Sequence, residues 1–332
     1  MVHVGAVGVE GLRGVARGRL DGLAPVTVLT GPNGCGKSTV LDAILLAGAT
    51  DVTGAVVSSL RRRGAVSDPA RWLFRAPDGA VARVTVGQSR NGIDVEFVRS
   101  VTLEVEGASR LVRVYRQDGV LRSEIASVRA DDRGENIGYK PGRDVGSAFE
   151  VGGLIDPGTW TSLERSYSEA VRRGRKAITV EMLARLLPGT IGLEILLDPS
   201  NAPVLHVASG VGAVPAALIG DGLRAFLRLS FGLAEFDGGV ALVEEPESFQ
   251  HPAALRCSAH AIVGAATRGT QVVLTTHSLE MIDALISAMR DVGHLDSLAV
   301  FNLALRDGVL VNNRAAGDDL RFARSEIEAD LR

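Results

Sequence analysis

Eight residues near the start of the chain have the types and spacing of a phosphate-binding loop. Residues 31–38 read GPNGCGKS, which fits the pattern GxxxxGK[ST] at every fixed position, and a threonine follows directly. In such a loop the glycines let backbone N–H groups face anionic oxygens, and the lysine reaches the β- and γ-phosphates of a nucleoside triphosphate. The residues predicted to bind ATP are therefore Asn33, Gly34, Cys35, Gly36, Lys37, Ser38 and Thr39. The Ser38 hydroxyl is also a predicted Mg²⁺ ligand.

Carboxylates follow an apolar run much later in the chain. Residues 240–247 read VALVEEPE, so four apolar residues are followed by a group of acids. A buried parallel strand that ends at an active-site edge has this pattern, whereas the alternative is a solvated acidic turn. In a phosphate-loop enzyme the first acid, Glu244, would join the Mg²⁺ shell. The second, Glu245, would orient or deprotonate the attacking water.

A histidine ends a third apolar run. Residues 271–278 read QVVLTTHS, and His277 stands at the tip of this predicted strand. The carboxyl ends of parallel strands meet at one edge of a sheet, so we expect His277 on the same side as Glu245. There it could donate a hydrogen bond to the γ-phosphate, although a lone histidine can also be structural.

The elements around these residues begin as a phosphate loop requires, with a short buried strand at 25–29 before the loop and a helix at 38–46 after it. From 80 to 125 the apolar residues then alternate with period two, with hairpin signals at Asp78-Gly79, Asn91-Gly92 and Asp118-Gly119. This pattern predicts an antiparallel sheet inserted after the helix.

The middle of the chain is predicted to combine a connection with a small helical unit. Residues 127–158 are polar and rich in glycine and proline, which predicts a connection without regular elements. Helices are predicted at 160–172 and 179–187, and strands at 191–197 and 204–207. No repeat or heptad run predicts a long coiled-coil arm.

Bulk properties limit the remaining choices. The chain has 332 residues, of which 46% are hydrophobic and 23% charged, with a net charge of −3. This is ordinary globular composition without a general polyanion-binding signature. Cys35 and Cys257 are too few for a disulfide framework, and no apolar run approaches about 18 residues. We therefore expect a cytoplasmic protein that is neither secreted nor membrane-spanning.

These stretches carry a resemblance to a known group. The runs LTGPNGCGKSTVLDAI, LIGDGLRAFLRL, ALVEEPESFQHP and VVLTTHS resemble prokaryotic ABC-type ATPases, the group that includes the overcoming-lysogenisation-defect and RecF-like ATPases. The resemblance implies an α/β, ABC-type P-loop NTPase fold with an inserted antiparallel β subdomain and a compact helical lid. It implies one domain over 1–332. Its parts would be a nucleotide-binding core (1–50 and 190–332), an inserted sheet (78–126), and a linker with the lid (127–188).

The resemblance also assigns roles to single residues. Gly220, Asp221 and Gly222 would form the signature motif, which in the ATP state would close the phosphate loop of a second copy. Glu244 and Glu245 would occupy the Walker B and catalytic positions, and His277 the switch position.

Some features depart from relatives of this group. Transporter ATPases have Ser-Gly-Gly in the signature and aspartate as the first Walker B acid, and this chain has neither. No glutamine is obvious at the usual Q-loop place, for which Gln88 is the nearest candidate. Some members carry a Toprim nuclease domain after the histidine strand, and we expect none in this chain.

Two classes of function therefore compete. In the first, the chain is an ATPase whose nucleotide-dependent homodimer controls a separate effector or nuclease, in anti-phage defence or DNA maintenance. In the second, it is the nucleotide-binding subunit of a membrane transporter; a phosphate-loop kinase is a more remote alternative. Two arginine-rich clusters, around 61–75 and 172–176, could neutralise a DNA backbone or could simply be solvated.

Overall fold

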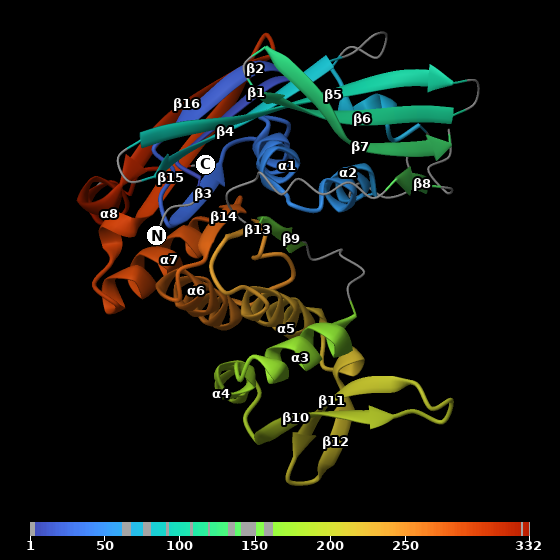
Figure 1. Ribbon diagram of the computed structural model, residues 1–332. Helices are drawn as coiled ribbons and strands as arrows, with labels where there is room; N and C mark the ends of the chain where they lie inside the picture. The colour runs from blue at the N-terminus through green and yellow to red at the C-terminus, as the bar shows by residue number, and fades with distance from the viewer. Residues whose placement is uncertain are drawn as a thin grey trace.

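The structure is a computed structural model that describes residues 4–61, 68–75, 81–90, 93–106, 109–118, 120–131, 137–140, 151–155, 162–326 and 328–331. Its strands and helices are arranged in one large, strongly curved sheet with helices on both faces, and a smaller lobe below it (Figure 1).

Among the described residues, the large sheet has 13 strands. In spatial order these are β8 (Ile137–Lys140), β7 (Leu121–Asp131), β6 (Ser109–Asp118), β5 (Ile93–Glu106), β4 (Val81–Arg90), β1 (Ala6–Leu12), β2 (Val15–Asp21), β16 (Val309–Ala316), β15 (Leu298–Arg306), β3 (Val26–Thr30), β14 (Gln271–Thr275), β13 (Val240–Glu244) and β9 (Val151–Ile155). Neighbours from β8 to β2 pair antiparallel. Neighbours from β15 to β9 pair parallel.

The parallel half positions the predicted chemistry. Every residue of β3, β13 and β14 is buried, as expected for parallel strands that are covered on both faces. Their register aligns the ends of the strands, because Glu244 lies opposite Thr275, and Thr275 lies opposite Leu29, one residue before the end of β3. The residues that follow these three positions therefore leave the sheet at one common edge.

Helices cover the two faces unequally. Figure 1 shows α1 (Lys37–Gly48) and α2 (Val52–Arg61) enclosed between the antiparallel half and the parallel strands. One apolar core accordingly joins α1 to residues from both halves, such as Val84 and Val273. On the other face, α6 (Pro252–Thr267), α7 (Leu279–Asp291) and part of α5 (Asp221–Ala234) pack in a second core. The remaining short elements are η1 (Arg71–Leu73), η3 (Leu295–Ser297) and α8 (Gly317–Ser325).

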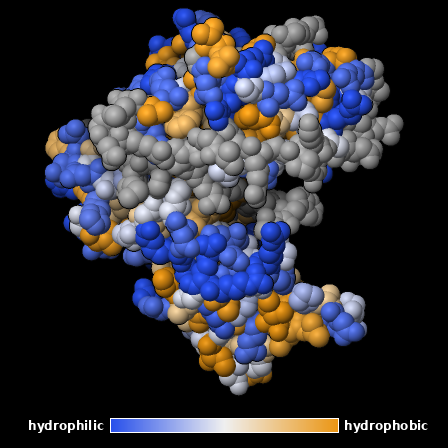
Figure 2. Space-filling model, viewed as in Figure 1, coloured by the Kyte–Doolittle hydropathy of each residue, from blue (hydrophilic) through white to orange (hydrophobic). Residues whose placement is uncertain are grey.

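The smaller lobe has a sheet of its own, which the sequence did not predict as separate. It contains β10 (Thr190–Leu197), β11 (Pro203–Ser209) and β12 (Gly212–Pro215), followed by η2 (Ala216–Leu218). These strands share an apolar core with α3 (Leu163–Arg172), α4 (Lys176–Leu186) and α5. Residues 190–215, predicted to belong to the nucleotide-binding core, therefore pack with α3–α5 and not with the large sheet. Figure 2 shows hydrophobic residues on the surface of this lobe, where Ile191, Leu197 and Val211 are exposed.

The other predicted elements agree with the structure in part. The period-two pattern forms β4–β7, and two predicted short runs join into the single strand β5. The predicted helices and strands between 160 and 207 are α3, α4, β10 and β11. The connection predicted at 127–158 is wrong where β7 continues to Asp131 and where β8 and β9 form. Of the residues in the predicted hairpin turns, Asp78, Gly79, Asn91, Gly92 and Gly119 lie outside the described residues.

Within the described part of the chain, no helix is long and apolar enough to cross a membrane.

Candidate functional site

The phosphate loop leaves β3 and ends in the first turn of α1. Gly31, Gly34 and Gly36 have φ values of 129°, 77° and 102°, in the left-handed region that favours glycine. Gly36 is the N-cap of α1, and no side chain caps this helix start, whose first turn contains no acidic residue. The backbone N–H groups and the helix dipole are therefore available to an anion, as a triphosphate requires.

Lys37 lies folded over this loop. Its Nζ donates hydrogen bonds to the carbonyl oxygens of Gly31 at 2.7 Å and Pro32 at 3.1 Å, and lies 3.9 Å from Cys35 Sγ. Burial lowers the pKa of the Lys37 ammonium, and the nearby Cys35, Glu245 and Glu247 oppose that shift. To bind a phosphate group, the Lys37 ammonium would exchange its hydrogen bonds to these carbonyl oxygens for hydrogen bonds to phosphate oxygens.

Ser38 and Glu244, the two predicted metal ligands, are in direct contact. Ser38 Oγ donates a hydrogen bond to Glu244 Oε1 at 2.5 Å. Glu244 is the last residue of β13 and is only 9% exposed. Two hard oxygens side by side beside the phosphate loop fit Mg²⁺, which uses one or two protein ligands together with phosphate oxygens and waters.

Glu245 and His277 meet at the same edge. The backbone of Glu245 has φ 44°. Its N–H donates to Thr275 O at 3.1 Å and to Thr275 Oγ1 at 3.2 Å. Its Oε1 lies 3.6 Å from His277 Nε2, and both side chains are partly exposed. The predicted loop, carboxylates and histidine are therefore brought together, as the pattern of strand ends predicts.

A third acid, Glu247, also belongs to this cluster but was assigned no role from the sequence. Its Oε1 accepts a hydrogen bond from the His277 backbone N–H at 2.7 Å. Burial raises the pKa of the Glu247 carboxyl, although the bonds from His277 and Thr276 oppose that shift. Its place in the run EEPE was the only available signal.

The predicted signature residues lie apart from the phosphate loop. Gly220, with φ 92°, caps α5, and Asp221 pairs with Arg224 at 3.1 Å. A Cβ at Gly222 would lie 2.6 Å from Phe249 O, so this turn packs against the segment that follows Glu247. Among the described residues, no hydrogen bond joins Gly220–Gly222 to the phosphate loop of the same chain.

Gln88, the nearest candidate for a Q-loop glutamine, lies at the opposite edge of the sheet. Its neighbour Gly87 accepts a hydrogen bond from Gly5 N, and Val4 N bonds to the side chain of Gln271. Gln271 is the first residue of β14, whereas the site gathers after the last residues of that strand. Gln88 is therefore not part of the site. Beside β13, β9 ends at Ile155, opposite Val243, and residues 156–161 lie outside the described residues.

The second arginine cluster is engaged in the structure of the lobe. Arg173 pairs with Glu169 at 2.8 Å, and Arg175 donates to Ala234 O at 2.7 Å, at the end of α5. This cluster thus stabilises the α3–α5 packing. In the first cluster, Arg71 lies 5.6 Å from the centroid of the exposed Trp72 ring. DNA binding there stays a prediction, which a gel shift at low salt tests.

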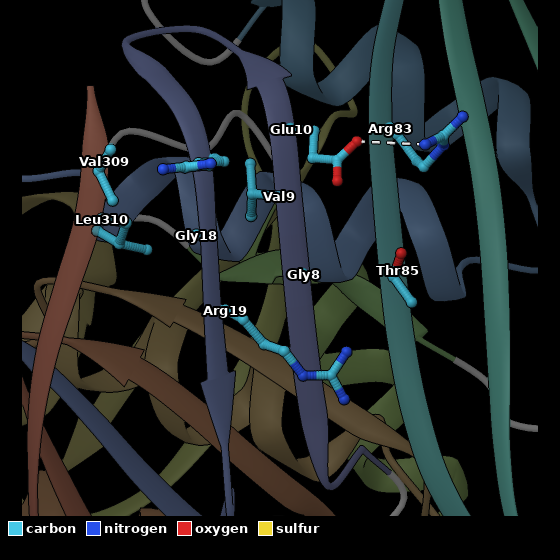
Figure 3. Close-up of a pocket in the computed structure, with 10 residues that line it drawn as sticks. Gly8, Val9, Glu10, Gly18, Arg19, Arg83, Thr85, Val309 and Leu310 are labelled. Atoms are coloured by element: carbon cyan, nitrogen blue, oxygen red, sulfur yellow. Dashed lines mark hydrogen bonds and ion pairs between the residues drawn. The ribbon is translucent and has the colours of Figure 1, made fainter. Parts of the chain in front are cut away.

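A hollow on the outer face of β1, β2 and β4 also contains arginines (Figure 3). Its volume is about 410 Å³, and Gly8 leaves its floor open between Arg19 and Thr85. Arg83 pairs with Glu10 at 3.3 Å, and Arg19 with Glu96 at 2.8 Å. These ion pairs neutralise much of the positive charge that a phosphate backbone would need.

Comparison with known proteins gives two family matches. The family described as "AAA domain, putative AbiEii toxin, Type IV TA system" matches residues 154–283. A family described as "AAA domain" matches residues 8–113. No curated protein matches the chain.

Solved structures of SMC heads have a similar fold. An SMC head bound to the C-winged helix domain of ScpA is 16% identical with a TM-score of 0.57, covering 95% of this chain and 98% of that chain. The SMC head domain from Thermotoga maritima is 14% identical with a TM-score of 0.51, covering 95% and 99%. An SMC head with an extended coiled coil, bound to the C-terminal domain of ScpA derived from Pyrococcus furiosus, is 14% identical with a TM-score of 0.57, covering 99% and 100%. The chain therefore has a mixed α/β fold of the SMC-head and ABC-type P-loop ATPase kind.

Proposed function

We propose that this chain, with its ABC-type P-loop ATPase fold and its AAA-type family matches, binds and hydrolyses ATP with Mg²⁺. The observation that supports this best is the meeting of two residue pairs at one sheet edge. Ser38 contacts Glu244 at 2.5 Å, and Glu245 lies 3.6 Å from His277. The first pair offers oxygen ligands for the metal, and the second offers a base and a hydrogen-bond donor.

Binding would depend on the loop and its lysine. The uncapped start of α1 directs N–H groups at the phosphates, and Lys37 neutralises charge on the β- and γ-phosphates. Ser38 and Glu244 would hold Mg²⁺, which when bound neutralises charge on the same phosphate oxygens.

Hydrolysis would depend on Glu245 and His277. Glu245 takes a proton from water while the water oxygen bonds to the γ-phosphorus and the bond to the β–γ bridging oxygen breaks. His277 donates a hydrogen bond to a γ-phosphate oxygen, where negative charge must be stabilised. The 3.6 Å between their side chains lets both face the same phosphate.

The test is to separate binding from turnover in the purified full chain. Lys37→Ala should lose tight ATP binding, because it removes charge that acts in both ground state and transition state. Glu245→Gln should keep binding and lose turnover by about 10²- to 10⁴-fold, as expected for a general base. Matched controls are Lys176→Ala, a lysine over the Tyr167 ring in the lobe, and Glu194→Gln on β10. Hydrolysis by Glu245→Gln at the native rate would exclude Glu245 as the base.

We further propose that ATP joins two copies head to tail, with Gly220-Asp221-Gly222 of one closing the phosphate loop of the other. A separate effector or nuclease would sense this dimer, in anti-phage defence or DNA maintenance. The support is the toxin–antitoxin description of one family and the ScpA domains bound to two of the SMC heads. The Glu245→Gln protein should copurify with its partner in ATP but not in ADP; equal recovery in both would count against this proposal.

A further inference from the structure

Glu247 joins two turns that carry the proposed chemistry. The turn after β13 is closed by Ser248 N to Glu245 O at 3.0 Å and by Gln250 N to Glu247 O at 3.0 Å. From this turn the Glu247 side chain reaches residue 277, which is 30 positions away, and accepts its backbone N–H at 2.7 Å. The contact thus links the turn of Glu245 to the turn of His277.

The position of His277 depends on few other constraints. In the turn after β14, Thr276 N donates to Leu29 O at 3.0 Å, and Ser278 N donates to Thr276 Oγ1 at 3.0 Å. The N–H of His277 itself bonds to Glu247. Besides this bond, the two turns meet where the Thr276 side chain bonds to Glu247 and where His277 Nε2 lies 3.6 Å from Glu245 Oε1, so the Glu247 bond is the one that fixes the His277 backbone itself.

Other roles fit Glu247 less well. Its Oε1 is engaged with His277, whereas the contact expected of metal ligands joins Ser38 to Glu244. Its Oε2 is buried without a hydrogen-bond partner among the described residues, so it is screened from bulk water. A carboxylate placed in this way can hold a neighbouring group, but it is poorly placed to exchange protons with an attacking water.

We propose that Glu247 is a positioning residue for ATP hydrolysis: its carboxylate fixes the His277 backbone so that the imidazole and the Glu245 carboxylate face one γ-phosphate. This inference rests on the proposed ATPase activity. Displacement of a reacting group by about 1 Å can cost on the order of 10²-fold in rate, so one hydrogen bond at this place affects turnover. Nucleotide binding, which depends on the phosphate loop, should be little affected.

Two conservative variants separate the position of the acceptor from its charge. Glu247→Gln keeps the reach and an acceptor oxygen while removing the charge. Glu247→Asp keeps the charge but withdraws the acceptor by one methylene. If Glu247 positions His277, the Gln variant should keep kcat within about fivefold, because a neutral acceptor is weaker but still present. The Asp variant should lose kcat by about 10- to 100-fold with KM for ATP nearly unchanged.

A double-mutant cycle then tests whether the effect passes through the histidine. His277→Ala removes the imidazole but keeps the backbone N–H, so adding Glu247→Asp to it should cause little further loss. Glu194→Ala, on an exposed position of β10, is the matched control. Bound-nucleotide affinity and thermal midpoints show whether each variant is folded.

Each result decides between distinct explanations. Additive losses in the double-mutant cycle would overturn the positioning role. A Glu247→Gln variant as impaired as Glu247→Asp would also overturn it, because the loss of turnover would then follow from the loss of charge. Native turnover by Glu247→Asp would overturn it as well. A wild-type protein that binds ATP without hydrolysing it would overturn the proposed ATPase function itself, together with this inference.

Discussion

At the scale of single residues, the backbone of Glu245 in the candidate site is strained. Glu245 has φ 44°, a conformation that costs a non-glycine residue on the order of 1–3 kcal/mol. Its N–H compensates in part by bonding to both the carbonyl and the hydroxyl of Thr275, which lies in the neighbouring strand. This backbone conformation turns the chain sharply after β13, and the Glu245 carboxylate therefore lies beside His277.

Residue types and spacing predicted which side chains gather here, but not their partners. Glu244 is the last residue of its strand, whereas Lys37, Glu245 and His277 follow strand ends, and parallel strands bring such ends together. Glu247 was missed because its contact is to a backbone N–H 30 residues away, which leaves no mark on the sequence. Their roles in catalysis stay predictions.

Because Glu247 is buried, we expect the difference in stability between wild type and Glu247→Gln to depend on pH. The pKa of its carboxyl is raised in the folded protein, so the folded state holds the proton more tightly than the unfolded state. Its contribution to stability is full below the ordinary glutamate pKa of about 4.3 and is lost as pH rises through the raised value. Glutamine cannot ionise, so the thermal midpoint of Glu247→Gln should rise relative to that of wild type as the pH rises above about 4.3.

Thermal melts at a series of pH values measure this difference. Ser248→Ala, a neighbouring change that alters no ionisable group, is the control. A difference between Glu247→Gln and wild type that stays constant, or becomes less favourable toward neutral pH, would contradict the buried-carboxyl interpretation.

At the scale of elements, α1 is anchored from both ends. Its start forms the phosphate loop, and in its middle the buried Asp42 pairs with Arg13 at 2.7 Å. At its other end, the fully buried Arg99 of β5 donates to Leu46 O and Ala49 O, each at 2.9 Å. A cation at a helix C-terminus also interacts favourably with the helix dipole. The inserted antiparallel strands thus hold the helix that presents the phosphate loop.

Loss of this anchor should destabilise the whole fold. Arg99→Met would leave two buried carbonyl oxygens without this donor, and we expect a loss of about 2–5 kcal/mol in the free energy of unfolding. Arg129→Met removes an exposed ion pair with Glu106 and should cost less than about 1 kcal/mol. Urea unfolding compares the two variants. Equal midpoints would show that Arg99 contributes no more than a surface arginine.

The apolar periodicity of the sequence predicted the strands themselves better than it predicted which elements they pack against. Alternation from 80 to 125 identified β4–β7 because one face of these strands packs on α1 and α2. The sequence did not predict β9 (VGGLI), because two glycines leave this five-residue strand without a run of apolar side chains. The strand pairs with β13. The strands at 190–215 were expected in the core because an antiparallel hairpin has the same apolar pattern whichever helices it covers.

At the scale of the whole molecule, two exposed apolar side chains lie near Gly220–Gly222, the proposed signature motif. Leu218, two residues before Gly220, is 73% exposed, and Phe249, whose carbonyl oxygen faces Gly222, is 75% exposed. A second copy docked there would bury both side chains beside the N-terminus of α5, which would then face the partner's γ-phosphate. This arrangement would make dimerisation depend on the nucleotide.

The proposed dimer predicts a substitution that blocks association without touching the nucleotide. The Glu245→Gln protein should be a dimer with ATP and a monomer with ADP by light scattering, because only ATP supplies the γ-phosphate. Adding Leu218→Arg should keep it monomeric by placing a charge inside the contact. Val211→Arg, at a fully exposed position, is the control and should still dimerise. Gly222→Arg is less informative, since its Cβ would meet Phe249 O at 2.6 Å and disturb the turn itself. A Leu218→Arg protein that dimerises normally with ATP would exclude this surface.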